Sequence, residues 1–364
     1  MLRRRTAAII IGFLAVFSLF RSSTEPYSLT ALMRSAGLLL LAGLMAPLWA
    51  HPARRPTPPA LTPTPPIQQA RNLVEWGRWK DARASLDQAI RQNPGDAELK
   101  AYQAHVLVAF GQLDAAVTLA RQAVKQDANC ATCHLYLSEA LGDEAKHEGK
   151  FRALIELRKV RAELKRAQQL GPNIADVHWG WLDLDLDLPV ALGGSPAAAM
   201  QEARTIGQID PVDGYLARAT VDLATGHNAA AQAEYREVAQ RYPTDPRGLF
   251  ALGLSLFQQG NYTAAEPLFR RAQRLQPQSA LYAGYHAATL VHLHRQIRAR
   301  DVLLKTRPMF PQTRLGDFLV AQALQKIGQD YVWARDLVHR YLQVPPEPDQ
   351  PSVQQARQLL MVLG

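Results

Sequence analysis

The feature that most constrains this chain is a set of turn residues that recur at one fixed spacing. Intervals of 34 residues separate Gly77 from Gly111, Gly226 from Gly260, Gly260 from His294, and His294 from Gly328. A constant period of this length indicates an array of identical structural units stacked along one axis. A chain of this kind buries its apolar side chains between neighbouring units and not around one central point.

Residues 246–279 form the clearest copy of the unit. Leu249, Leu252 and Leu256 are spaced by three and four residues, which places them on one face of a helix. Gly260 follows and supplies the positive φ that ends this helix. The unit therefore begins with an amphipathic helix and a tight turn.

A second helix completes the unit with small and apolar residues at fixed places and a proline after its end. In the clearest copy these residues are Ala265, Phe269, Ala272 and Pro277. The pattern Leu-x2-Leu-Gly-x2-Leu, then Gly-x-Tyr, then Ala, Phe, Ala and Pro resembles the tetratricopeptide repeat, over about residues 63–347. The resemblance implies an all-α fold: a right-handed α-solenoid of about eight helix-turn-helix units, with residues 353–363 as a capping helix. It also implies a protein that holds partners.

The period stretches between residues 131 and 211. A long charged helix is expected at about 150–170, followed by a helix that contains Trp179 and Trp181. Ser195 and Pro196 then have the residue types of a helix start. We interpret this stretch as two enlarged repeats within one solenoid that covers residues 67–364.

The N-terminal part has a different composition. Residues 1–50 contain two apolar runs preceded by arginine, which predicts a secretory signal peptide or, alternatively, an N-terminal membrane segment. Residues 51–66 are rich in proline and predict an extended linker. We therefore expect a periplasmic or otherwise extracytoplasmic protein, or one anchored in the inner membrane with its solenoid outside.

In such a superhelix the first helices of the repeats line the concave face. On this basis the best copy offers Arg247, Phe250, Leu254 and Phe257, and a later copy adds His292. These side chains predict a groove for an apolar, partly acidic peptide. The alternative is that the phenylalanines fill the core between repeats.

The most specific local motif is Cys130-Ala131-Thr132-Cys133-His134. The pattern Cys-x-x-Cys-His is a c-type haem attachment sequence. Because Cys130 and Cys133 are the only cysteines and export leads to an oxidising compartment, a disulfide between them is the favoured interpretation. A haem held by Cys130, Cys133 and His134, a redox-active thiol, or two ordinary, partly buried thiols remain the alternatives.

Other chemistries find little support. The chain carries a net charge of +9, but its basic run at 152–166 is interleaved with glutamates and not with aromatic residues, so no nucleic-acid partner is expected. The spacing Asp183-x-Asp185-x-Asp187 lacks the glycine and final glutamate of a calcium loop, and no metal is expected. No catalytic motif is present. The sequence thus predicts an exported, non-catalytic scaffold that binds a protein or peptide, with the haem or thiol redox protein as the alternative.

Overall fold

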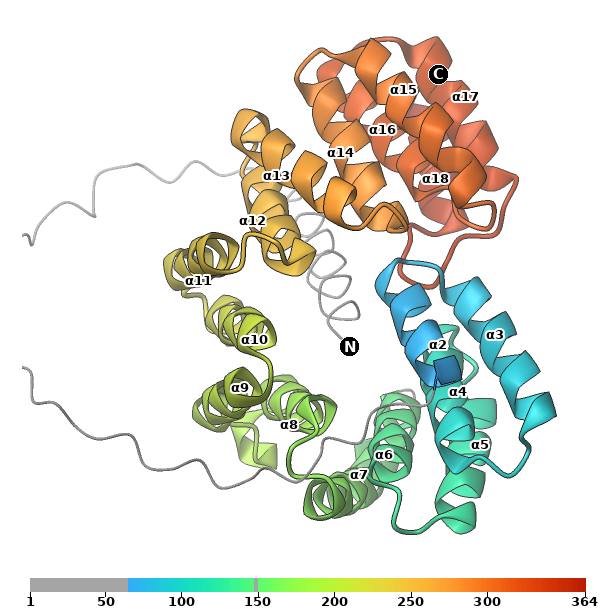
Figure 1. Ribbon diagram of the computed structural model, residues 1–364, viewed down its shortest axis with the longest axis vertical. Helices are drawn as coiled ribbons and strands as arrows, with labels where there is room; N and C mark the ends of the chain where they lie inside the picture. Colours follow the sequence, from blue (N-terminus) through green and yellow to red (C-terminus); the bar gives the residue numbers. More distant parts are fainter. Residues whose placement is uncertain (1–64, 147–149) are drawn as a thin grey trace, which may run out of the picture.

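The computed structural model describes residues 65–146 and 150–364, and every regular element in them is helical. The first eight helices are α2 (Pro65–Glu75), α3 (Trp79–Gln92), α4 (Ala97–Ala109), α5 (Leu113–Gln126), α6 (Ala131–Ala145), α7 (Lys150–Leu170), α8 (Ala175–Asp187) and α9 (Pro196–Ile209). The others are α10 (Pro211–Ala224), α11 (Asn228–Arg241), α12 (Pro246–Gln258), α13 (Tyr262–Leu275), α14 (Ala280–His292), α15 (Gln296–Thr306), α16 (Leu315–Ile327), α17 (Tyr331–Leu342) and α18 (Val353–Val362). Two short 3₁₀ helices, Val190–Leu192 and Arg307–Met309, lie in the connections. The predicted all-helical solenoid is confirmed (Figure 1).

The turn residues that set the period share one backbone conformation. The glycines at 77, 111, 226, 260 and 328 all have φ between +69° and +80°. His294 replaces the glycine in its repeat, and its φ of +56° lies in the same left-handed region. The geometry of the turn, rather than the identity of the residue, is therefore what the repeat keeps.

Small side chains let the two helices of each unit approach closely. One alanine at the matching place of the second helix is completely buried in six units: Ala82, Ala116, Ala199, Ala231, Ala265 and Ala299. Larger residues further along the same helices, such as Leu86 and Phe269, are buried as well. The core is thus a continuous strip between the helices, as close packing in a solenoid requires.

Stacking also places residues one period apart side by side. His105 Nδ1 lies 2.7 Å from Glu139 Oε2, and Arg247 Nη1 lies 2.8 Å from Asp213 Oδ1. Each pair is separated by 34 residues and joins the first helices of two consecutive units. These contacts fix the register between neighbouring units.

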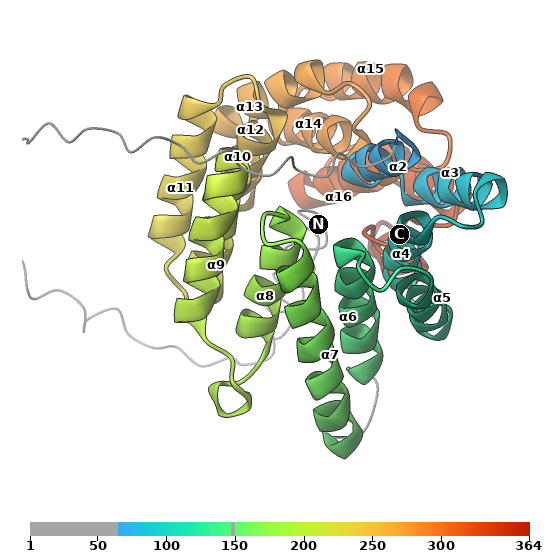
Figure 2. The same cartoon turned by 60° about the horizontal axis from the view of Figure 1, so that its bottom comes forward.

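The two ends of the solenoid meet, so that its helices follow a closed loop (Figures 1 and 2). The Ala280 N–H donates to the Trp76 carbonyl at 3.1 Å, and the Lys80 N–H donates to Glu347 Oε2 at 3.0 Å. The Lys80 side chain donates to two further backbone carbonyls of the C-terminal region. We call this set of bonds the closing contact. The sequence gives no indication of it because its partners lie in distant repeats.

The predicted signal or membrane segment at 1–50, and the linker up to residue 64, lie outside the described residues. Pro65 and Pro66, assigned to the linker from sequence, instead begin α2. Proline tolerates this place because the first N–H groups of a helix have no partner within it. None of the helices in residues 65–146 and 150–364 is both long and apolar enough to cross a membrane.

Candidate partner-binding groove

The enlarged repeat contains an open apolar groove between α6, α7 and α8. These three helices lie side by side, and α7 projects beyond its neighbours (Figure 2). The groove has a volume of about 910 Å³. This is at the upper end of the size that binding pockets usually have.

The floor of the groove consists of aliphatic side chains from all three helices. Leu135, Val160 and Leu164 are almost completely buried there. Leu154 on α7 and Leu192 after α8 lie at the rim, with 44% and 39% of their surfaces exposed. Exposed aliphatic side chains that continue a buried apolar floor are typical of a surface that binds a partner.

A glycine in α8 allows this packing. A Cβ atom at Gly180 would lie 2.9 Å from Leu164 Cδ1 and 3.2 Å from Leu135 Cδ1. Both distances are shorter than normal contacts, so the absence of a side chain lets α8 approach α6 and α7. The groove is therefore part of the close-packed architecture of the enlarged repeat.

Carboxylates border the apolar floor. Glu139 and Asp143 belong to α6, and Asp183 and Asp187 belong to α8. The single basic side chain that lines the described groove is Lys146, whose Nζ lies 3.2 Å from Asp143 and 3.4 Å from Asp187. Burial alone would lower the pKa of Lys146, but these two carboxylates outweigh that effect and raise it. The groove has an excess of negative charge.

The strip predicted from sequence has a different environment. Arg247 forms ion pairs of 2.7 to 2.9 Å with Asp210, Asp213 and Asp245, so its charge is compensated within the chain. Burial raises the pKa of Asp213 to about 6, although Arg247 lowers it. The Arg247 side chain therefore already has three partners within the chain, and its contact with an acidic peptide stays a prediction.

The aromatic residues of the strip pack inside the solenoid. Phe250 and Leu254 are only 5% and 6% exposed, and the Phe250 ring lies 4.8 Å from that of Tyr282. This agrees with the alternative that the side chains fill the core between repeats. Phe257 is half-buried, and its ring lies 5.5 Å from that of His292.

His292 stacks flat on Tyr262, with 3.9 Å between the ring centroids and an interplanar angle of 5°. Burial lowers the pKa of His292 to about 4, with further contributions from Lys326 and His294. The ring is therefore neutral at physiological pH. Phe257 and His292 retain some accessible surface, but they offer no charge to a partner.

The Cys-x-x-Cys-His motif lies at the start of α6. Cys130 and Cys133 are joined by a disulfide, with 5.3 Å between their Cα atoms. Both ring nitrogens of His134 have partners, since Nδ1 lies 2.5 Å from Glu163 Oε2 and Nε2 lies 3.0 Å from the Ala128 carbonyl. The disulfide and the bonds of His134 thus stabilise the beginning of α6. No group of three or more metal-binding side chains occurs in residues 65–146 and 150–364.

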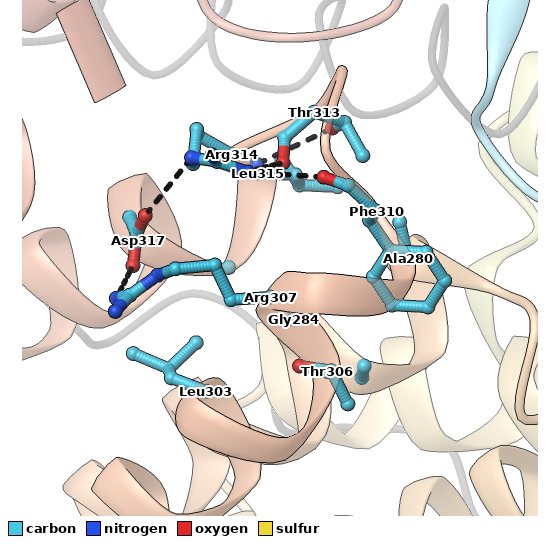
Figure 3. A pocket seen from close by; sticks show the side chains of 12 residues that line it. Ala280, Gly284, Leu303, Thr306, Arg307, Phe310, Thr313, Arg314, Leu315 and Asp317 are labelled. Atoms are coloured by element: carbon cyan, nitrogen blue, oxygen red, sulfur yellow. Dashed lines mark hydrogen bonds and ion pairs between the residues drawn. The ribbon is translucent and has the colours of Figure 1, made fainter. Parts of the chain in front are cut away.

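A second cavity, of about 30 Å³, lies between α14, the 3₁₀ helix at 307–309 and α16 (Figure 3). Asp317, only 3% exposed, pairs with Arg307 at 2.7 Å, while Arg314 lies 4.0 Å away. Burial raises the pKa of Asp317, although Arg307 and Arg314 lower it. The cavity is too small for a peptide, and its ion pairs stabilise the repeats that form the closing contact.

Sequence reasoning did not find the groove, because it looked for binding residues in the regular repeats. Two signals were present: the stretched period between 131 and 211, and Gly180 next to Trp179 and Trp181. Neither shows by itself that α6, α7 and α8 leave apolar side chains uncovered. That follows only from how the long helix α7 crosses its neighbours.

The chain contains segments of a known repeat family. Models of the tetratricopeptide repeat match residues 73–141 and 216–280. No curated protein matches this chain in sequence.

Solved structures also match this chain, at low sequence identity. A chain of the APC/C hetero-tetramer Cut9-Hcn1 has a TM-score of 0.44 and 15% identity. The match covers 82% of this chain and 55% of the Cut9-Hcn1 chain, so this chain spans about half the length of that one. A tetratricopeptide repeat protein from Parabacteroides merdae has a TM-score of 0.38 and 13% identity, with coverage of 82% and 97%. A thermophilic TPR protein from Thermus thermophilus has a TM-score of 0.31 and 18% identity, with coverage of 66% and 97%.

The family matches fall on the two parts of the chain where the 34-residue period is most regular. The structure shows the paired helices and left-handed turns of the repeat in both parts. Solenoids of this kind present extended surfaces for protein interaction. The chain belongs to the tetratricopeptide repeat superfamily.

Proposed function

We propose that this protein is a non-catalytic scaffold that holds a protein or peptide partner in the groove between α6, α7 and α8. The observation that carries the proposal is an open groove of about 910 Å³ with an apolar floor. Aliphatic side chains that stay uncovered lose favourable burial, so a partner that covers them gains free energy on binding. The family supports the same class of function, because its repeats mediate protein interaction.

We also propose that the protein works outside the cytoplasm. The support is the signal-like composition of residues 1–50 together with the disulfide between Cys130 and Cys133, since such bonds persist in oxidising compartments. A role in envelope assembly or secretion would fit a scaffold in that place. The membrane-anchored form differs only in whether the N-terminal segment is retained, which the intact mass of protein from the cell envelope would reveal.

The haem alternative has no comparable support. The two sulfur atoms are bonded to each other, and both nitrogens of His134 already have partners. The buried His134 ring would have to leave both of them to ligate an iron atom. Nothing in the geometry of the motif favours this over a structural bridge.

Affinity purification of three full-length forms tests the scaffold. Leu157→Asp places a charge on the wall of the groove, whereas Ile297→Asp changes a side chain that is 80% exposed on α15. We expect the same partner to be recovered with the wild-type protein and with Ile297→Asp, and to be lost with Leu157→Asp. Equal recovery with all three forms would contradict the proposed site.

A further inference from the structure

We infer that the groove binds an amphipathic helix of the partner whose apolar face is flanked by lysine or arginine side chains. This inference rests on the proposed function and specifies the chemistry of the partner. It follows from three properties of the groove: an aliphatic floor, helical walls, and carboxylates on α6 and α8.

The walls decide the backbone conformation of the occupant. An extended peptide binds well where a sheet edge offers it free N–H and C=O groups. The walls here are α-helices, whose backbone groups are bonded within each helix, so they offer no such edge. A segment that enters an apolar groove must then satisfy its own backbone groups, and a helix does this.

The dimensions agree with a short helix. The lining residues on α6 and its C-cap run from Leu135 to Lys146. At 1.5 Å per residue this stretch is roughly 16 Å long, which corresponds to about three helical turns. Three turns present apolar side chains at positions i, i+3 or i+4, and i+7, which is the usual set of anchors for a helix in a groove.

The carboxylates decide the charge of the occupant. Glu139 and Asp143 are four residues apart on α6, and Asp183 and Asp187 are four residues apart on α8. Each pair therefore lies along one face of its helix. Among the described residues that line the groove, Lys146 is the only one with a cationic side chain, so carboxylates outnumber amines there by four to one.

These carboxylates also have partners inside the protein that hold them in place. Glu139 bonds to His105, and Asp143 and Asp187 bond to Lys146. Lysine or arginine beside the apolar face of a bound helix would meet this negative charge next to an apolar surface, where charge pairs are weakly screened. Glutamate on the flanks, or the carboxylate of a fatty acid, would be repelled.

Fluorescence anisotropy with two labelled helical peptides tests the inference. The peptides share one leucine-rich face and differ only in their flanks, which carry lysine in one and glutamate in the other. We expect the full-length protein to bind the lysine peptide at least about ten-fold more tightly. We also expect that binding to weaken as the salt concentration rises, because salt screens charge pairs.

Variants then locate the binding site. Asp183→Asn with Asp187→Asn should weaken binding of the lysine peptide about ten-fold, and Leu157→Asp should abolish it. The matched control, Asp114→Asn with Asp301→Asn, removes two exposed carboxylates on α5 and α15 and should leave binding unchanged. Circular dichroism melting curves establish that each variant is folded.

Equal affinity for the two peptides, no binding of the lysine peptide, or an equal effect of both double variants would overturn the inference. Binding of a fluorescent fatty acid in place of either peptide would do so as well. The scaffold proposal is judged separately, by whether a partner is lost with Leu157→Asp. If that partner is lost but the two peptides bind equally, the inference fails while the proposed function stands.

Discussion

The closing contact makes one prediction that can be worked out in detail, because it buries a carboxyl group. Glu347 is only 2% exposed and accepts a hydrogen bond from the Lys80 N–H. Burial raises the pKa of Glu347 to about 8 from its ordinary 4.5; Lys80 lowers it, but not enough to compensate, and Asp349 and Asp81 raise it further. The folded protein therefore holds a proton on Glu347 at neutral pH.

The sign of the pH dependence follows from this difference. Between pH 4.5 and about 8 the folded state binds more protons at Glu347 than the unfolded state, so stability falls as the pH rises through this window. The full effect is reached above pH 8 and amounts to at most about 5 kcal/mol, at about 1.36 kcal/mol for each pKa unit. Opening of the closing contact would expose Glu347, so the loss cannot exceed the stability of that contact.

Glu347→Gln removes the ionisation and keeps an oxygen that can accept the bond from Lys80. We expect the variant to melt within a few degrees of the wild type at pH 6 and clearly above it at pH 9. The assay is thermal unfolding of both proteins at the two pH values, with small-angle scattering at pH 9 to detect an opened solenoid. Because other titrating groups are common to both proteins, the same change in melting temperature with pH in each would refute the reasoning.

Three further predictions concern packing, charge and the disulfide. A Cβ atom at Gly214 would lie 2.2 Å from the Cα of Gly207, whereas one at Gly207 would lie 3.4 Å from the Cα of Gly214. In urea unfolding, Gly214→Ala should therefore lower the free energy of unfolding by about 3 kcal/mol, and Gly207→Ala by less than about 1 kcal/mol. Arg247→Ala leaves three aspartates without their common partner and should lower the free energy of unfolding by about 2 kcal/mol at pH 8. The loss should be smaller at pH 5, where Asp213 is protonated. An equal loss at both pH values would contradict this. Substituting Cys130 and Cys133 by serine should lower the unfolding free energy by about 2 kcal/mol, the value for a very short closed loop, and unchanged stability would show that the bridge contributes nothing.

Local pattern was sufficient to predict the repeats. The turn positions, the small buried residues and the helix start at Ser195 all depend on neighbours within one unit, and the structure has a bond from the Ala198 N–H to the Ser195 hydroxyl as this start requires. Even the weakest copy follows the rule, because His294 adopts the glycine conformation. A repeated sequence pattern reflects interactions within one 34-residue unit.

Interactions between units were harder to predict from the sequence. The sequence shows Arg247 beside two phenylalanines, but not the aspartates from α10 and its preceding turn that neutralise it. It likewise gives no indication that Trp76 and Lys80 meet the C-terminal repeats. The groove was not predicted from the sequence for the same reason, because it depends on how α7 packs against α6 and α8.

The most direct test of the scaffold proposal is site-specific photo-crosslinking in living cells. A photoreactive amino acid is placed in turn at Leu157 in the groove, at His292 on the strip first expected from sequence, and at Ile297 on the exposed surface of α15. Mass spectrometry then identifies the attached segment. We predict one discrete protein adduct from position 157 and none from 297; adducts from 292 alone, or the same adducts from all three positions, would contradict the groove as the binding site.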